Sequence, residues 1–555
     1  MYKILNMQKM IHKISMSSLI YYLFFGFIFW HLAKEMLQVK SSGWYVGQVN
    51  LYGDLVYHLA LINKFITSQD IVIDNPILAG DKINYPIFAD FMTSLITITT
   101  SIDFALFITT LIGGIIVLFV SKLFIKTFIK SNKVAFLTLL LFLLNGGFGF
   151  FYFFRDYAIS QKSLLNFMLS LPREYTDLKD LGYWWINSLL AYFLPQRGFL
   201  FAFPITLIVL LLLYRGYKKN QRLYFLLAGI ITGSLPLVQA HSLFVIFILS
   251  TIYFPLSLYK NKEFKTLIIN WILFGAVAAA VALPLFKIIS SVSNPLDFIR
   301  YDPGWTSKEN IFWFWLKNLG FFAPVLIVSI VWLFKNAKIF ILYLPFLVIF
   351  FISNIWIFQP WEFDNSKLLI YWYFASCIVA AYFLSYALFT GHIFKKITGL
   401  FIVILITFSG SLDLFRTFTP VSSYQIYTKQ DLEVARQTKL LTPENAVFVT
   451  ASNHNNPIPT LTGRSTIIGF HGWLWSHGVN YTKQANDVKV IYLGDKTAED
   501  LIKKYKIYYV TVGPQEIQDF SINLNYYRNY PQINLASGWN LYDVSNLWAD
   551  SDGQN

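Results

Sequence analysis

The sequence has very little charge and only one cysteine. Of its 555 residues, 13% are charged and 56% are hydrophobic, and the mean hydropathy is +0.51. Soluble domains carry about 25% charged residues, so this composition excludes a soluble protein. The lone cysteine, Cys377, lies in an apolar run and excludes both an intramolecular disulfide and a thiolate metal cluster. The net charge of +14 does not indicate nucleic-acid binding, because many of the basic residues lie between apolar segments.

The sequence does contain a series of apolar segments about twenty residues long, together with 19% aromatic residues. Segments of this length cross a bilayer as helices. The first is residues 18–37, and because no small-residue cleavage site follows it, we interpret it as a retained span and not as a signal peptide. The other candidates are residues 104–125, 133–153, 198–214, 223–239, 241–258, 266–289, 311–334, 339–358, 367–389 and 395–413. We therefore expect a polytopic α-helical membrane protein with about eleven transmembrane helices.

The short loops predict the orientation. The N-terminus and alternate loops hold 18 of the 44 basic residues but only one acidic residue, Glu263. These loops are residues 122–133, 215–222, 260–265, 335–338 and 395–396. The positive-inside rule makes this set cytoplasmic, and eleven alternating spans place every member on one side. We expect a cytoplasmic N-terminus and a multi-pass protein of the cell membrane.

The long segments then face outward, and two domains are predicted. Residues 1–413 form the transmembrane domain, whose first outer loop is residues 38–103 with interfacial helices. Residues 414–555 are long enough for an extracytoplasmic α/β domain with its own core. Its expected strands are residues 446–451, 466–469, 488–492 and 508–512, with a helix over 498–505. No Gly-rich dinucleotide fingerprint opens a helix there, and no internal repeat supports a transporter built from inverted halves.

The first outer loop contains the segment Gly53-Asp54-Leu55-Val56-Tyr57-His58-Leu59. Asp54 and His58 are four residues apart and share one helix face. An ionised carboxylate beside an imidazole suits proton abstraction or phosphate contact. The alternative is that Asp54 only caps a helix or lies on the surface.

A first span, a large outer loop with an early acidic residue, interfacial helices and the Tyr85-Pro86 element together resemble the GT-C superfamily. The resemblance implies an integral-membrane glycosyltransferase that takes sugar from a polyprenyl-phosphate carrier. In that superfamily the catalytic carboxylate lies in the first outer loop, and Asp54 is the position that matches. It also implies a GT-C-like fold with an outer C-terminal domain.

The C-terminal segments 461–464, 469–478, 488–492 and 509–516 resemble the outer domain of the archaeal and Chloroflexi YYY membrane proteins. The Trp473-Leu474-Trp475 run is also similar to the acceptor-reading Trp-Trp-Asp motif of oligosaccharyltransferases. No aspartate follows these tryptophans, so recognition of an Asn-x-Ser/Thr acceptor cannot be carried over.

Further candidate residues lie in outer turns. Arg197, His241 and Lys367 are expected to contact a carrier phosphate, although snorkelling explains Arg197 and Lys367 equally well. Glu362 and Asp364 position Lys367 or the acceptor, or else they cap the next helix. His471, Trp473 and His477 form an aromatic and histidine loop suited to sugar or phosphate, with ordinary turn chemistry as the alternative. No His-x-x-x-His spacing supports zinc, and the scheme requires no metal or other cofactor.

Together with these residues, the resemblance implies a cell-envelope enzyme of protein or lipid glycosylation, an inverting glycosyltransferase of hexosyltransferase type. Its partners are a polyprenyl-phosphate-linked sugar donor, an unknown extracytoplasmic acceptor and membrane lipids, with no nucleic acid. Asp54 is the expected general base, and His58 orients it or joins the phosphate contacts. Two alternatives remain open. One is a lipid-linked glycan transporter or polymerase, and the other is a non-catalytic glycan-binding membrane protein, in which Asp54 would face away from the polar turns.

Overall fold

The structure is a computed structural model that describes residues 15–68, 73–259, 261–290 and 298–552. Lys3, Lys9, Lys13 and Lys260 of the predicted basic set lie outside these residues. Within the described part, eight helices are long and apolar enough to cross a membrane, and a bent pair makes a ninth. The eight are α2 (Met16–Lys34), α5 (Ile102–Phe128), α9 (Arg197–Lys219), α11 (Ala240–Leu258), α12 (Phe264–Ile289), α15 (Ala337–Ile355), α16 (Ser366–Thr390) with its preceding turn η4 (Glu362–Asn365), and α17 (Ile393–Arg416).

The remaining predicted spans are short or broken. The apolar helices α6 (Asn132–Leu143) and α10 (Arg222–Val238) have fewer than 18 residues. Predicted span 133–153 breaks after Leu143, where Gly147 lies so close to the backbone of Lys317 and Asn318 that no Cβ fits. Predicted span 311–334 is the pair α13 (Ile311–Leu319) and α14 (Phe322–Leu333), bent by 98° at Gly320, whose φ is +58°. A positive φ ends a helix and favours glycine.

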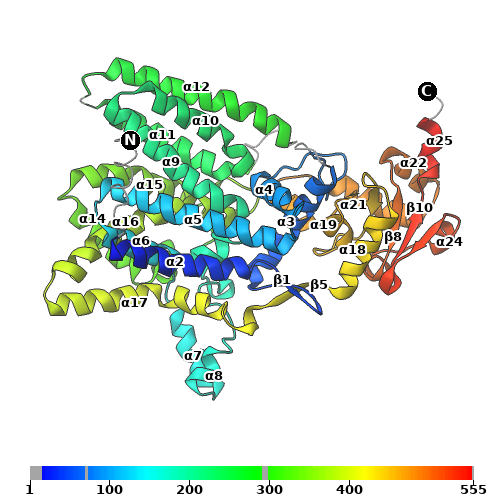
Figure 1. The fold of residues 1–555 in the computed structure, drawn as a ribbon, viewed down its shortest axis with the longest axis horizontal. Coiled ribbons are helices and arrows are strands. Elements are labelled where there is room, and N and C mark those ends of the chain that lie inside the picture. Colours follow the sequence, from blue (N-terminus) through cyan, green and yellow to red (C-terminus); the bar gives the residue numbers. More distant parts are fainter. Residues whose placement is uncertain (1–14, 69–72, 260, 291–297, 553–555) are drawn as a thin grey trace, which may run out of the picture.

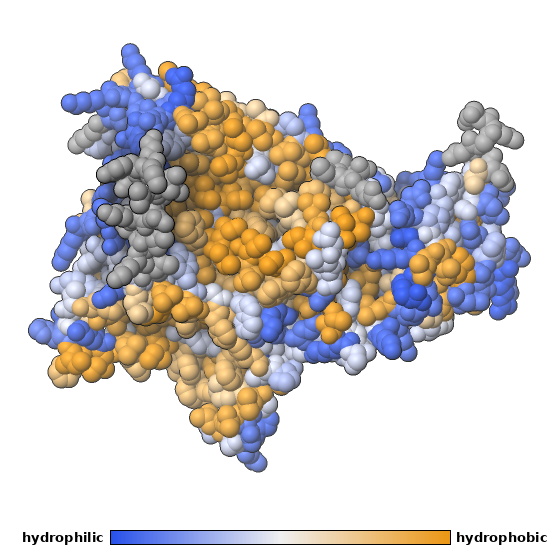
Figure 2. Space-filling model, viewed as in Figure 1, coloured by the Kyte–Doolittle hydropathy of each residue, from blue (hydrophilic) through white to orange (hydrophobic). Residues whose placement is uncertain are grey.

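The long helices run side by side, and the C-terminal part lies at one end of them (Figure 1). Basic loops such as the one joining α9 to α10 gather at the end away from the C-terminal part. Figure 2 shows a broad hydrophobic surface between two hydrophilic ends. Inside this bundle α16 packs against α6, α14, α15 and α17. The chain is therefore a multi-pass membrane protein with a separate polar portion at one end.

The segment after α2 begins with two short strands, β1 (Gln38–Lys40) and β2 (Gly43–Val46), followed by α3 (Val49–Ser68) and α4 (Phe88–Thr97). β2 also pairs with β5 (Tyr424–Thr428), which follows the last long helix. One antiparallel sheet thus joins the first outer segment to the C-terminal part. The predicted boundary at residue 413 falls inside α17, which continues to Arg416.

The C-terminal part is built on a mixed five-stranded sheet of order β7-β6-β8-β10-β9. Its strands are β6 (Val447–Val449), β7 (Ser465–Thr466), β8 (Tyr509–Val512), β9 (Gln532–Asn534) and β10 (Asn540–Asp543). β6 is parallel to β7 and β8, whereas β10 is antiparallel to β8 and β9. The predicted α/β class is therefore confirmed. The strands predicted over 446–451 and 508–512 are present in shorter form, and the one predicted over 466–469 shares only Thr466 with β7.

The prediction of a strand over residues 488–492 is wrong, because this segment belongs to helix α21 (Thr482–Leu493). Val-Lys-Val-Ile-Tyr alternates like a strand at first, but Val488, Ile491 and Tyr492 also have the i, i+3, i+4 spacing of a helix face, and these three are the buried ones. The predicted helix over 498–505 is α22 (Lys496–Lys504).

The remaining elements are short. Between α6 and α9 lie α7 (Phe150–Ser160), α8 (Leu164–Met168), η1 (Lys179–Leu181) and the π-helical turn η2 (Leu189–Phe193). β3 (Arg300–Tyr301) pairs with β4 (Trp356–Ile357). The C-terminal part also contains η5 (Pro420–Ser422), α18 (Lys429–Leu441), α19 (Pro457–Leu461), α20 (His471–Ser476), α23 (Pro514–Asp519), α24 (Leu524–Tyr527), η6 (Ala536–Gly538) and α25 (Asn546–Asp552).

Candidate active site around Asp54

Asp54 lies in the second turn of α3 and is half-buried. Gln196, the residue before α9, donates from Nε2 to Asp54 Oδ2 at 3.1 Å. Burial raises the pKa of Asp54, and the charges of His58 and Lys367 oppose that shift, whereas Asp364 adds to it. Asp54 therefore faces the polar turns before α9 and α16. Its raised pKa makes it a stronger base when ionised.

Lys367 and Asp364 form an ion pair beside this carboxyl group. Lys367 Nζ lies 3.0 Å from Asp364 Oδ2, and the two side chains are only 12% and 11% exposed. Both belong to the turn and first residues of α16, three positions apart along one face. Lys367 also acts electrostatically on His241, which is half-buried in the first turn of α11. Asp54 and His241 therefore both lie near the Lys367–Asp364 pair.

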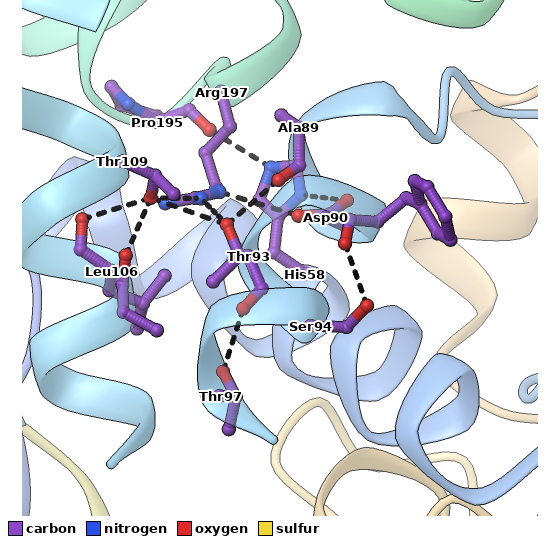
Figure 3. Close-up of polar contacts among 12 residues, drawn as sticks. His58, Ala89, Asp90, Thr93, Ser94, Thr97, Leu106, Thr109, Pro195 and Arg197 are labelled. Carbon is purple, nitrogen blue, oxygen red and sulfur yellow. Dashed lines mark hydrogen bonds and ion pairs between the residues drawn. The ribbon is translucent and has the colours of Figure 1, made fainter. Parts of the chain in front are cut away.

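His58 and Arg197 are engaged in a different way from the one predicted (Figure 3). His58 Nδ1 lies 2.8 Å from Asp90 Oδ2, and its Nε2 donates to the carbonyl of Pro195 at 3.2 Å. Arg197 Nε lies 3.3 Å from Asp90 Oδ1. His58, Asp90 and Arg197 are 1%, 0% and 3% exposed. Asp90 thus lies between the imidazole of His58 and the guanidinium of Arg197.

This network corrects the expected role of Arg197. Its guanidinium donates to Thr93 and Thr109, so its contacts are with α4 and α5 and not with an open phosphate site. Both nitrogens of His58 are likewise taken by Asp90 and Pro195 instead of Asp54. The physical reason is burial, because a cation that is removed from water needs an internal counter-ion. Asp90 supplies it from the apolar segment Phe88–Thr97.

The C-terminal part closes over the start of α3. Trp473 Nε1 and His454 Nε2 both donate to the carbonyl of Gly53, at 2.9 and 3.0 Å, directly before Asp54. The ring of His477 lies 5.1 Å from that of Tyr57 and 4.8 Å from that of Tyr85. Burial, with Lys367 and His58 nearby, lowers the pKa of His477 to about 3. His477 is therefore neutral at pH 7 and suited to hydroxyl contacts, not to charge neutralisation.

Two predicted residues lie apart from this group. His471 stacks on Tyr481 at 4.7 Å, and its backbone N–H donates to Ser452. Glu362 is 41% exposed and lies 3.6 Å from Arg300, while its carbonyl accepts from Trp305. The contacts of His471 and Glu362 fix loops around the site. Among the described residues, neither of the two contacts Asp54.

Three residues near Asp54 are absent from the sequence-based set. Gln196 donates a hydrogen bond to Asp54, and Asp90 contacts His58 and Arg197. Glu174 accepts from Asn50, one helical turn before Asp54, at 3.2 Å. Burial and the acidic neighbours Asp413 and Asp177 raise the pKa of Glu174 to about 8, so its neutral form prevails at pH 7. The sequence does contain one feature that could have pointed to Asp90, because it is an ionisable residue inside an apolar interfacial segment.

Within the described residues, no three His, Cys, Asp or Glu side chains are grouped as a metal site would require. The chemistry available at Asp54 consists of a carboxylate base, an ammonium group paired with Asp364, and neutral hydrogen-bonding groups. Tyr85 is one of these groups, since burial and nearby Asp54 raise the pKa of its hydroxyl.

No protein-family model and no curated protein matches this chain. Solved structures do match it. The apo crystal structure of ArnT from Cupriavidus metallidurans superposes with a TM-score of 0.51 at 12% identity, over 96% of this chain and 98% of that one. The structure of ArnT bound to undecaprenyl phosphate gives 0.46 at 11% identity, over 96% and 99%. ArnT has a GT-C fold. From the apo comparison, the chain has a GT-C-like membrane fold over nearly its whole length.

Proposed function

We propose that this protein is a membrane glycosyltransferase that transfers one sugar from a polyprenyl-phosphate carrier to an acceptor hydroxyl. The observation that carries the proposal is the placement of Asp54, held by Gln196 and facing the Lys367–Asp364 pair, in a GT-C-like fold. A non-catalytic protein would not need a half-buried carboxylate aimed at the polar turns. The basic loops at the far end support an extracytoplasmic position for this site.

The proposed reaction is a single inverting displacement. The acceptor oxygen attacks the anomeric carbon while its proton passes to Asp54, and the bond from that carbon to the phosphate oxygen breaks. The phosphate leaves with the electron pair, and Lys367 with His241 stabilises its charge. His477 and Tyr85, both neutral, contact sugar or acceptor hydroxyls. Arg197 and His58 hold the site in shape through Asp90.

The test is transfer by purified protein in lipid nanodiscs, supplied with radiolabelled polyprenyl-phosphate sugars and a crude envelope extract as acceptor. Asp54→Asn should lower transfer by roughly 100-fold or more, because general-base catalysis contributes that much. Asp81→Asn, in the same outer segment, is the matched control and should retain activity. Equal transfer by the Asp54→Asn variant contradicts the proposal.

The rival functions give different results in the same experiment. A transporter would move the labelled carrier across proteoliposomes without breaking the sugar–phosphate bond. A binding protein would retain the glycan without releasing free carrier phosphate. Either result from the unmodified protein, with no transfer to any acceptor, overturns the assignment as an enzyme.

A further inference from the structure

A cavity of about 990 Å³ lies where the outer segment meets the C-terminal part, away from Asp54. Its walls come from α3, α4, the start of α5 and helix α18. Most of the lining is apolar, including Phe65, Phe91, Leu95, Ile98 and Leu432. Ligand pockets of drug size have volumes of about 300–1,000 Å³, so the space is large enough for a lipid chain.

The lining carries positive but no negative charge. It includes Arg436 and Lys439 and contains no Asp or Glu. Arg436 pairs with Glu433 at 2.7 Å. Lys439 Nζ donates to the amide oxygen of Asn63 at 3.1 Å, and among the described residues it has no acidic partner within ion-pair distance. An ammonium group beside an apolar cavity, facing a neutral partner, is complementary to an anion.

A second buried cation, Arg464, adds to the positive charge near Lys439. Arg464 is 3% exposed, and its guanidinium donates to the backbone carbonyls of Thr462, Lys439 and Thr442. Burial and the charge of Arg464 lower the pKa of Lys439 to about 8. An anion bound at Lys439 would relieve the repulsion between these two cations.

The cavity lies at the membrane boundary. Leu95 and Ile98 are 47% and 63% exposed, and α5, a membrane-spanning helix, begins at Ile102. Figure 1 places the ends of α3, α4 and α5 between the bundle and α18. The apolar rim therefore lies beside the start of a membrane-spanning helix, while Lys439 lies on α18, on the side of the C-terminal part.

We propose that this cavity binds one anionic phospholipid, with an acyl chain among Phe65, Phe91 and Leu432 and its phosphate at Lys439. This arrangement follows from an apolar wall that continues into the bilayer and a cation without an acidic partner at its polar end. The site is independent of the proposed reaction, because Asp54 does not line it. It would tie the C-terminal part to the membrane surface.

The experiment is native mass spectrometry of the full-length protein released from nanodiscs that contain equal amounts of phosphatidylglycerol and phosphatidylcholine. We expect one retained phosphatidylglycerol per protein, in preference to phosphatidylcholine. Lys439→Gln should reduce this preference roughly fivefold, the factor that corresponds to about 1 kcal/mol for one lysine at an anionic surface. Lys496→Gln, on the same C-terminal part but outside the cavity, is the matched control and should leave it unchanged.

A second variant tests the cavity itself. Ala435 is small, buried and part of the lining, so Ala435→Phe should fill the space and abolish retention of the lipid. If that variant does not fold, Lys439→Gln still decides the matter. Three outcomes would overturn the proposal. The unmodified protein could retain the two lipids equally, it could retain detergent alone, or Lys439→Gln could leave the preference for phosphatidylglycerol unchanged.

Discussion

The imidazole of His58 lies 2.8 Å from the carboxylate of Asp90, and both side chains are completely enclosed by protein. Asp90 also faces Arg197, so one carboxylate contacts side chains from both α3 and α9. Because His58 bonds the carbonyl of Pro195, the same network fixes the turn that carries Gln196 to Asp54. A contact deep among the helices thus controls the position of the candidate base.

Removal of this carboxylate should be strongly destabilising. Asp90→Asn leaves Arg197 buried without a counter-ion and removes the acceptor of His58, and breaking a buried ion pair in this way costs about 3–5 kcal/mol. Thermal unfolding in detergent should show a large drop in Tm. The double variant Asp90→Leu/Arg197→Met removes both charges and should recover part of the loss, since the coupling between neighbours is not additive. A double variant that is as unstable as the sum of the singles would argue against a shared ion network.

The pH dependence of transfer should report the charges around Asp54. A base works when ionised, so activity should rise as the pH increases through the raised pKa of Asp54. Lys367 lowers that pKa, so Lys367→Gln should move the rising limb to higher pH. Asp364 raises it, so Asp364→Asn should move the limb to lower pH. Asp302→Asn, an exposed acid in another turn, is the control, and a shift of the same sign in both test variants would contradict this assignment.

The close fit of residues 462–464 against α3 can be tested at two glycines. Gly463 has φ +76°, and a Cβ there would lie 2.7 Å from the carbonyl oxygen of Asn63. Gly80 has φ +81°, but a Cβ there would meet nothing within 4 Å. Gly80→Ala should therefore cost only the backbone strain, on the order of 1 kcal/mol, and Gly463→Ala clearly more. Urea or thermal unfolding of the full-length protein would measure the difference, and equal costs would show that the contact with α3 is loose.

His477 should make the folded state sensitive to acid. Its pKa falls from an ordinary value near 6.5 to about 3, so between these values the unfolded chain binds more protons than the folded one. Stability should then decrease as the pH falls below about 6.5. His477→Gln removes this term, so its Tm should depend less on pH between 6 and 4. The exposed His392 provides the control substitution, and an unaltered pH slope in His477→Gln would falsify the account.

The fold class was predictable because the signals are local. Long apolar runs such as Ile102–Phe128 and the asymmetry of basic loops require no knowledge of tertiary contacts. The break at Gly320 was not predictable, since an isolated glycine is tolerated in many helices. The feature that sets this glycine apart is its close approach to the backbone of Gly147, which is a tertiary contact. The alternation at Val488–Tyr492 fits two periods equally over five residues, and only packing selects the helix.

The candidate site was predictable in part for the same reason. Asp54, Asp364 and Lys367 are polar residues next to apolar segments and stand out along the chain. Asp90, the partner of Arg197, could not be recognised in this way. It is more than 100 residues away from Arg197, and its role depends on how α4 lies against α5 and α9. Likewise, nothing local distinguishes His477, which lies against Tyr85, from His471, which lies against Tyr481.

The sheet formed by β1, β2 and β5 has a consequence for biosynthesis. Its first two strands leave the ribosome soon after α2, but the third follows α17, almost 400 residues later. Trp473 and His454, which bind the carbonyl beside Asp54, emerge later still. During most of translation the segment around Asp54 consequently lacks its contacts with β5, Trp473 and His454. Completion of the candidate active site is one of the last events in the maturation of the chain, and a truncated product that contains every membrane helix would still lack it.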